Sequence, residues 1–399
     1  MYGGRSHSIA IKTDGTLWAW GANYYGQLGD GTNADKNVPI KIGNGNDWKS
    51  ATASGDHTLA IKTDGSLWAW GYNNYGQLGD GTKTNSKTPI RIGNSSDWKS
   101  VYIGDIHTIA IKNDGTLWAW GANGFGQLGD GTDNSKTKPI KIDTSSDWKF
   151  FSSGGAHGLA IKTDGTLWAW GWNMFGQLGD GTKIDNNTPL KIGTSSDWKS
   201  ISAGYNYSIA IKNDGTLWAW GSNVNGELGD GTNIDKNIPI KIDTSTDWFS
   251  IFTANNHTFA TKYDGSIWTW GENSVGQLGD GTKTASNLPI QVGSKSDWKS
   301  ISAGGYHVIA LRETYTNVET DFLNNTNINF IETRDDIIIQ DLNENDEVQI
   351  YNLLGIMITK FNVGNESEFR FNKSNLNGVY FVKVISNQNN YFFKFICNN

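Results

Sequence analysis

A fifty-residue repeat organises most of this chain. The segment Lys12–Gly21, Lys-Thr-Asp-Gly-Thr-Leu-Trp-Ala-Trp-Gly, returns with conservative changes at Lys62, Lys112, Lys162, Lys212 and Lys262. Copies in constant register predict a repeat protein, because each unit must bury its apolar residues against the next. In every copy an Asp-Gly pair separates an apolar run from an alternating Leu-Trp-Ala-Trp segment, which is a strong signal for a β-hairpin. The repeat unit is therefore predicted to be all-β.

The unit spanning 48–93 illustrates the predicted strands. They are 48–53, 57–61, 67–70 and 88–92, with a long loop rich in Gly and Asn before the last one. Pro89 restricts that last strand to a strand start or an unpaired edge. Short antiparallel strands repeated radially are the plan of a β-propeller, so each unit is predicted to form one blade.

Tryptophan supplies the predicted packing between units. The chain has 19 tryptophans, of which 18 occupy three fixed repeat positions, those of Trp18, Trp20 and Trp48. The first two positions are two residues apart, so their side chains share one face of a strand. Each buried aromatic side chain of this size removes about 150 to 250 Å² from water. Only Trp172 lies outside this repeat pattern.

The blade count follows from the two ends of the repeat region. The His-bearing strand occurs seven times, but the Trp-Ala-Trp strand and the Pro-Ile strand occur six times each. Either 298–304 completes the first blade and makes six, or a seventh blade is present in part, and we favour the second. Residues 4–8 align with the middle of a repeat. We therefore expect the natural chain to begin upstream, with any signal peptide outside this sequence.

Charge and composition exclude several classes of function. The formal net charge is −7 and the repeats are nearly neutral, without the clustered Lys and Arg that phosphate binding needs, so no nucleic acid partner is expected. No run approaches the roughly 18 apolar residues of a membrane helix, so no transmembrane segment is expected. The single cysteine, Cys397, excludes an intrachain disulfide framework.

The histidines invite a catalytic or metal-binding interpretation, which their regularity opposes. His7, His57, His107, His157, His257 and His307 occupy equivalent positions, with Tyr207 in the fifth unit. Radial repeats separate equivalent side chains, whereas a metal needs several ligands around one ion. We expect a structural histidine, hydrogen-bonded to backbone at a turn. The loops also lack the EF-hand, phosphate-loop and Gly-x-Ser-x-Gly patterns. No metal, no cofactor and no enzymatic activity are therefore expected.

The residues that vary between repeats lie in the long loops. At positions 22, 24 and 25 and their equivalents, each of the first four units has at least one aromatic residue and the last two units have none. Packing does not dictate loop residues, so these can meet a partner. The candidate partner-binding residues are Tyr24, Tyr25, Tyr72, Tyr75, Phe125, Trp172 and Phe175. On one rim they would form a hot-spot patch for a protein or a glycan. Alternatively, each packs on its neighbouring loop, and the sequence leaves both interpretations open.

The repeat unit resembles a known family. His-x-x-Ala-Ile-Lys-x-Asp-Gly-x-Leu-Trp-Ala-Trp-Gly, then Gly-Gln-Leu-Gly-Asp-Gly-Thr and Pro-Ile, is similar to the regulator of chromosome condensation repeat, from Met1 to about Arg312. The resemblance implies a seven-bladed propeller that serves as a binding platform. The founding member is a guanine nucleotide exchange factor, but the blade insertion and basic tail expected of that role are absent here. A bacterial β-lactamase inhibitor of the same fold, which acts through its loop face, is the better guide.

The chain from Thr314 onward has neither Trp nor Pro and forms a second domain. Its alternating apolar segments and Asn-Gly turn predict a small antiparallel β-sandwich. It resembles the type A C-terminal sorting domain of type IX secretion, found in Bacteroidota, although the Tyr-Pro-Asn-Pro entry and basic ending common in that family are absent. The residues carrying this resemblance are Tyr351, Leu354, Gly355, Gly378, Val379, Tyr380 and Lys383. It implies contact with the type IX secretion machinery.

The sequence thus predicts an all-β chain with six near-complete propeller blades and a partial seventh over 1–313, a linker at 314–320 and a sorting domain at 321–399. The expected function is a secreted or cell-surface module that binds a protein or a glycan through its propeller loops. The alternative is an inhibitor or modulator of an extracellular hydrolase. A guanine nucleotide exchange factor is the least favoured interpretation.

Overall fold

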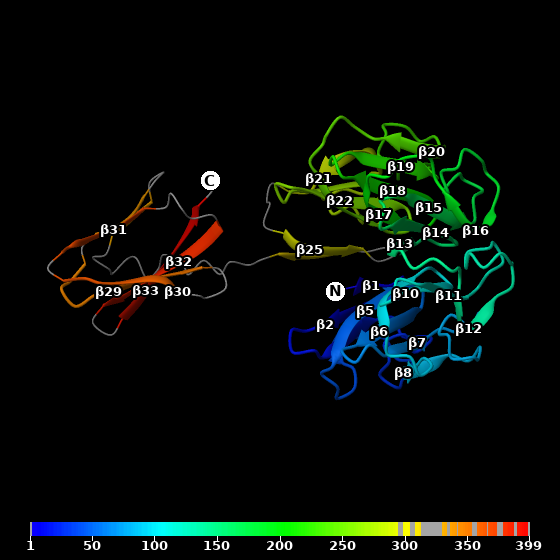
Figure 1. Cartoon of the computed structure of the whole chain (residues 1–399), viewed down its shortest axis with the longest axis horizontal. Coiled ribbons are helices and arrows are strands. Elements are labelled where there is room, and N and C mark those ends of the chain that lie inside the picture. The colour runs from blue at the N-terminus through cyan, green and yellow to red at the C-terminus, as the bar shows by residue number, and fades with distance from the viewer. Residues whose placement is uncertain are drawn as a thin grey trace. The chain divides into compact units, whose positions relative to one another are not determined.

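The computed structural model describes residues 2–293, 298–303, 308–312, 329–332, 336–340, 342–352, 357–364, 366–372, 378–386 and 389–397. The chain divides into two compact units, Met1–Glu313 and Thr314–Asn399. The first contains six four-stranded antiparallel sheets, which we call blades 1 to 6, and one two-stranded sheet (Figure 1). The predicted propeller of all-β units is confirmed.

Each blade holds its four strands in chain order. Blade 1 contains β1 (Tyr2–Gly3), β2 (His7–Ile11), β3 (Leu17–Gly21) and β4 (Lys36–Lys41). Blade 2 contains β5 (Trp48–Ser54), β6 (His57–Lys62), β7 (Leu67–Gly71) and β8 (Ser86–Arg91). Blade 3 contains β9 (Trp98–Ile103), β10 (His107–Lys112), β11 (Leu117–Gly121) and β12 (Lys136–Lys141).

The later blades repeat this pattern. Blade 4 contains β13 (Trp148–Ser153), β14 (His157–Lys162), β15 (Leu167–Gly171) and β16 (Asn186–Lys191). Blade 5 contains β17 (Trp198–Ala203), β18 (Tyr207–Lys212), β19 (Leu217–Gly221) and β20 (Lys236–Lys241). Blade 6 contains β21 (Trp248–Thr253), β22 (His257–Lys262), β23 (Ile267–Gly271) and β24 (Ser286–Gln291).

A partial seventh unit closes the ring. Strand β25 (Trp298–Ala303) pairs with β26 (Val308–Arg312), while β1 pairs with β2. Strand β25 therefore does not complete the first blade, and the partial seventh blade that we favoured is present. The first strands of successive blades contact one another, and β25 contacts both β21 and β1. These contacts form a closed ring around one axis.

The predicted Asp-Gly hairpin is confirmed, and its geometry explains the glycine. In blade 2, the Gly65 N–H donates to the Lys62 carbonyl at 3.0 Å, and Gly65 has a φ of +78°. This left-handed residue after a turn belongs to a three-residue hairpin loop. The Asp64 carboxylate accepts the Ser66 N–H at 2.9 Å and its hydroxyl at 2.6 Å. A Cβ at Gly65 would lie 2.1 Å from the carbonyl oxygen of Ser96, so both torsion and space require glycine.

Indoles join neighbouring blades, as the sequence predicts. In blade 3, the rings of Trp98 and Trp120 meet edge to face at 5.9 Å. Trp120 is fully buried, and its Nε1–H donates to the carbonyl of Gln77 in blade 2 at 2.9 Å. The same bond to the preceding blade occurs at Trp70, Trp170, Trp220 and Trp270, with lengths of 2.8 to 3.1 Å. Each of blades 2 to 6 is therefore hydrogen-bonded to the blade before it.

The outermost strand begins earlier than predicted. In blade 2 it spans Ser86–Arg91 instead of 88–92, because the register shifts between Ala69 and Gly71 and Gly71 then pairs with Ser86. Such a bulge adds a residue to one strand of a pair. Pro89 lies in this edge strand, where the missing N–H costs no ladder bond, as the sequence predicts.

The second unit is a β-sandwich. One sheet contains β27 (Asn329–Glu332), β28 (Asp336–Gln340) and β31 (Glu368–Asn372). The other contains β30 (Met357–Asn362), β29 (Glu347–Asn352), β32 (Gly378–Ser386) and β33 (Asn389–Cys397). Residues of both sheets share one core cluster, which includes Ile337, Ile339, Val348, Ile350, Phe369, Val382 and Val384. The predicted small antiparallel sandwich is confirmed.

Candidate binding face

One end of the propeller carries both sets of residues that vary between repeats. The turn between the first and second strands of a blade and the long loop between the third and fourth leave the sheet at the same end, since antiparallel neighbours alternate in direction. The two adjoin directly: the Tyr72 N–H donates to the Asp56 carbonyl, and the Trp172 N–H donates to the Ala156 carbonyl, both at 2.9 Å. We call this end the loop face.

A buried asparagine fixes the shape of each long loop. In blade 2, Asn73 is fully buried, and its Nδ2 group donates to Asp80 at 3.2 Å and to the Thr84 carbonyl at 3.0 Å. Its Oδ1 atom accepts the Leu78 N–H at 2.9 Å. Equivalent bonds hold the loops of the other five blades. The repeated residues therefore build the loop, which leaves the variable positions free to differ.

Four of the predicted binding residues form one continuous cluster, the tyrosine ladder. The ring centroids of Tyr24 and Tyr25 are 4.8 Å apart, and those of Tyr25 and Tyr72 are 4.7 Å apart. Tyr72 and Tyr75 follow at 6.3 Å. The side chain of Tyr24 is 74% exposed and that of Tyr75 is 43% exposed. The ladder crosses from blade 1 to blade 2 and presents phenol rings to solvent.

The other three form a second cluster, the tryptophan ladder, between blades 3 and 4. Trp172 lies between Phe125 at 5.3 Å and Phe175 at 5.5 Å, measured between ring centroids. Phe125 is 45% exposed. No ring contact among the described residues links the two ladders, since blade 3 has the small, buried Ala122 at the linking position. The single predicted patch is therefore two patches, and inner rings pack on neighbouring loops while outer rings remain exposed.

Exposed aliphatic side chains continue the pattern where aromatic residues end. Met174 and Val224 occupy one loop position in blades 4 and 5, Val275 occupies the next position in blade 6, and the three are 59%, 65% and 61% exposed. The sequence interpretation counted only aromatic residues and missed them. Apolar side chains at a loop position with no packing role were the available signal. All six long loops therefore expose an apolar side chain at this face.

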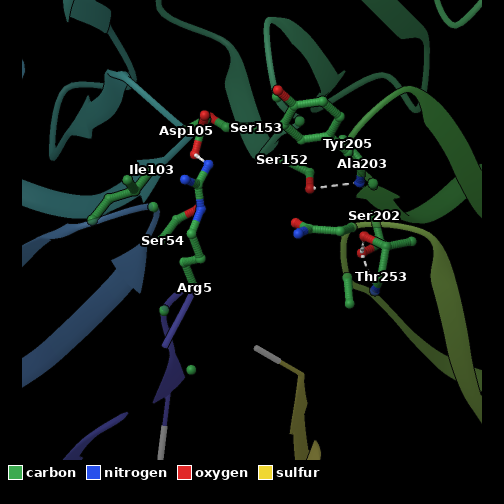
Figure 2. A pocket seen from close by; sticks show the side chains of 18 of the residues that line it. Arg5, Ser54, Ile103, Asp105, Ser152, Ser153, Ser202, Ala203, Tyr205 and Thr253 are labelled. Atoms are coloured by element: carbon green, nitrogen blue, oxygen red, sulfur yellow. Dashed lines mark hydrogen bonds and ion pairs between the residues drawn. The ribbon is translucent and has the colours of Figure 1, made fainter. Parts of the chain in front are cut away.

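A polar cavity of about 190 Å³ opens at the axis of the same end (Figure 2). Its described lining comes from all six blades and includes Arg5, Ser54, Asp105, Ser152, Ser202, Tyr205, Thr253 and Asn255. We call it the axial pocket. Sequence reasoning missed it, although the turn positions 5, 55, 105, 155, 205 and 255 read Arg, Gly, Asp, Gly, Tyr and Asn in an otherwise uniform repeat.

An ion pair lies in the lining of the axial pocket. Arg5 in blade 1 reaches past blade 2, and its Nη2 lies 2.8 Å from the Oδ1 of Asp105 in blade 3 (Figure 2). Burial opposes the charge of Arg5, but the carboxylates of Asp105 and Asp56 outweigh it and raise the arginine pKa. Burial also raises the pKa of Asp56. The pocket therefore holds a guanidinium and a carboxylate that neutralise each other.

The repeated histidines lie inside the blade interfaces. His157 is fully buried, and its Nε2 lies 3.1 Å from the hydroxyl of Ser208 in the next blade. Burial lowers the pKa of His57 to about 3 and that of His107 to about 4. The prediction of a backbone partner is wrong for these three side chains: His157 bonds a hydroxyl, and the ring nitrogens of His57 and His107 have no described partner. Groups of His, Cys, Asp or Glu able to hold a metal ion are absent from the described part of the chain.

The predicted sorting residues fall partly on described strands. Tyr351 lies on β29 and Lys383 on β32, and these strands pair so that Gln349 faces Lys383 and Tyr351 faces Phe381. Gly378, Val379 and Tyr380 open β32. Leu354, Gly355 and the predicted linker 314–320 lie outside the described residues. In the part of the chain that the structure describes, no helix is long and apolar enough to cross a membrane.

Comparison with known families agrees with this architecture. Residues 1–251 match the RCC1-like domain, and residues 264–311 match the regulator of chromosome condensation (RCC1) repeat. Residues 324–398 match the secretion system C-terminal sorting domain. No curated protein matches the chain significantly.

Two solved propellers are similar to the chain. Human WBSCR16 has a TM-score of 0.72 at 21% identity, over 79% of this chain and 86% of its own. Yeast RCC1 (Prp20), solved with Kap60 bound, has a TM-score of 0.69 at 22% identity, over 77% of this chain and 78% of its own. Identity at this level shows a common fold. The chain belongs to the RCC1-like domain family and carries a secretion system C-terminal sorting domain, which indicates export by type IX secretion to the cell surface or exterior.

Proposed function

We propose that this chain is a secreted or surface-displayed binding module that engages a protein or glycan partner through its loop face. The observation that carries the proposal is the separation of roles within each blade. Repeated residues such as Asn73 and Trp70 build the loops and the blade interfaces. The variable side chains of the long loops and of the first turns lie on one face, where rings such as Tyr24 remain exposed.

The chemistry of this face suits partner binding. Aromatic side chains are enriched among interface residues that dominate binding energy, and exposed apolar clusters on soluble proteins mark interaction sites. Rings such as Trp172 are held by their neighbours on both sides, at 5.3 and 5.5 Å, so little side-chain entropy is lost when a partner binds. Export through the sorting domain would bring this face to the cell exterior.

We also propose that the module is not itself an enzyme. General acid and base catalysis needs two titratable groups with separated pKa values at one site. In the turn of blade 2, hydrogen bonds from Ser66 lower the pKa of Asp64. The carboxylate is therefore ionised and already bonded within the turn. The carboxylates with raised pKa, Asp56 and Glu227, belong to blades 2 and 5 and owe the shift to burial.

The test removes one ring from each ladder. The Tyr75→Ala, Trp172→Ala double variant should lose partner capture from culture supernatant and from a glycan array, with affinity reduced about 30-fold or more, because truncating a hot-spot aromatic costs about 2 kcal/mol or more. Tyr263→Ala is the matched control, since Tyr263 is 61% exposed in the turn between β22 and β23 at the opposite end.

Two results would contradict the proposal. One is unchanged capture of every ligand by the double variant, and the other is an equal loss in the Tyr263→Ala control. If the captured partner is a hydrolase whose activity falls on binding, the module acts as an inhibitor through the same face.

A further inference from the structure

We infer that the axial pocket is a sugar-binding subsite that takes the terminal, uncharged monosaccharide of a glycan. This deepens the proposed function and rests on it, since the pocket opens on the loop face. Ligand sites are concave and place a few convergent polar groups for specificity. Here those groups come from all six blades.

Size limits the occupant to a single small unit. The cavity volume is about 190 Å³, below the roughly 300 to 1,000 Å³ of sites for drug-sized ligands. At about 30 Å³ per molecule it would hold roughly six waters. One sugar ring is therefore the fitting size, whereas an oligosaccharide must extend from the mouth toward the surrounding loops.

The charges in the pocket favour a neutral ligand. An anion would need a free guanidinium, but Arg5 is paired with Asp105 at 2.8 Å. A cation would need a free carboxylate there, and the same pair removes it. The bond still leaves other guanidinium N–H groups and the second carboxylate oxygen able to contact hydroxyl groups, since arginine has five N–H donors and a carboxylate has about four acceptor sites.

Apart from Arg5, Asp105 and Tyr205, the polar side chains of the described lining carry hydroxyl or amide groups. Ser54 and Asn255 make no side-chain hydrogen bond to a described residue, although both line the cavity. The Ser152 oxygen accepts the Ala203 N–H at 2.9 Å, which leaves its own hydroxyl proton to donate (Figure 2). Groups that both donate and accept match sugar hydroxyls, which do the same.

An aromatic ring completes the match. Tyr205 lines the pocket and is 39% exposed. A tyrosine ring offers an apolar face beside polar groups, as a sugar ring does with its C–H face and its hydroxyls. Gly154 and Gly204 also line the pocket, and glycine is required there because a Cβ would lie 2.3 Å from the buried His157 and 2.0 Å from the buried Tyr207.

The experiment measures binding of small probes to the full chain. Methyl glycosides of glucose, galactose, mannose and N-acetylglucosamine are titrated by saturation-transfer NMR and calorimetry, with acetate and methylammonium as charged probes. We expect at least one glycoside to bind with a millimolar Kd. Asn255→Leu, which removes the amide, and Ser54→Leu, which fills the cavity, should each weaken it at least tenfold.

Controls separate this inference from the proposed function. Asn94→Leu makes the same change at an exposed residue of the opposite end and should leave sugar binding intact. Three results would each overturn the inference. They are binding of no glycoside, competition by either charged probe, and full sugar binding by both pocket variants with unchanged thermal unfolding. If Tyr75→Ala with Trp172→Ala abolishes partner capture while no glycoside binds, the sugar subsite is refuted and the loop-face function stands.

Discussion

The bond between neighbouring blades can be tested with Trp120→Phe. Trp120 is fully buried, and its Nε1–H donates to the Gln77 carbonyl of the preceding blade at 2.9 Å. Phenylalanine keeps an aromatic ring against Trp98 but removes the donor and part of the ring. The Gln77 carbonyl still accepts the Thr108 hydroxyl at 2.9 Å, so no buried acceptor is orphaned.

The expected cost follows from these contacts. A lost hydrogen bond whose acceptor remains satisfied costs about 0.5 to 1.5 kcal/mol. Removing the larger ring loses the burial of about two methylene equivalents, at about 0.8 kcal/mol each. The free energy of unfolding should therefore fall by about 2 to 3 kcal/mol.

The matched control is Trp118→Phe in the same strand. Its Nε1–H donates to the Thr116 hydroxyl of its own blade at 2.9 Å, and its side chain is only partly buried. We expect a loss of about 1 kcal/mol or less, comparable to one exposed hydrogen bond. Urea unfolding, followed by far-ultraviolet circular dichroism, measures the loss of unfolding free energy in both variants. Hydrogen exchange locates the weakened interface. A cost for Trp118→Phe equal to that of Trp120→Phe would refute the role of the interblade bond.

Three further predictions concern buried groups and tight turns. Burial lowers the pKa of His57 to about 3 and of His107 to about 4, below the unfolded value of 6.5, so stability is fully present above pH 6.5 and is lost as pH falls toward these values. In urea unfolding at pH 5, the free energy of unfolding should be lower than at pH 7 by roughly 2 kcal/mol per histidine. His107→Phe removes one of these groups, so the pH-dependent loss in this variant should be smaller by the share of one histidine. Burial raises the pKa of Glu227, so Glu227→Gln should increase the free energy of unfolding at pH 7, and this gain should disappear as pH falls through the raised pKa toward the unfolded value. In thermal unfolding, Gly79→Ala should lower the free energy of unfolding by several kcal/mol more than Gly279→Ala. Both glycines have a positive φ, of +82° and +68°, so the backbone strain is shared. Only at Gly79 would the new Cβ meet an indole, that of Trp120 at 2.6 Å. Equal costs at the two glycines would show that the indole contact is unimportant.

The fold was predictable because its determinants are local and repeated. Asp64-Gly65 encodes the hairpin through a carboxylate acceptor and a left-handed glycine, which any copy of the repeat reveals. The positions of Trp68 and Trp70 on one strand identify the packing face. The start of the outer strand was misplaced because a bulge at Gly71 shifts the register, and the bulge depends on pairing with Ser86.

The candidate site was only partly predictable, because it depends on the curvature of the ring. Loop variation identified Tyr75 and Phe125 as candidate binding residues. The two ladders are separate because the small Ala122 occupies the position that would link them, and that linking role is visible only when neighbouring loops are seen in the structure. The axial pocket joins residues one hundred positions apart, as with Arg5 and Asp105. Such a meeting depends on how many blades close the ring, which no local pattern specifies.

The indole bond has a direction, and this bears on how the propeller assembles. Each bond runs from an indole to a carbonyl 43 residues earlier in the chain, as from Trp220 to Gln177. During synthesis from the N-terminus, the carbonyl acceptor of each of these bonds is therefore made before its indole donor. We expect the blades to assemble sequentially, each docking onto the blade translated before it.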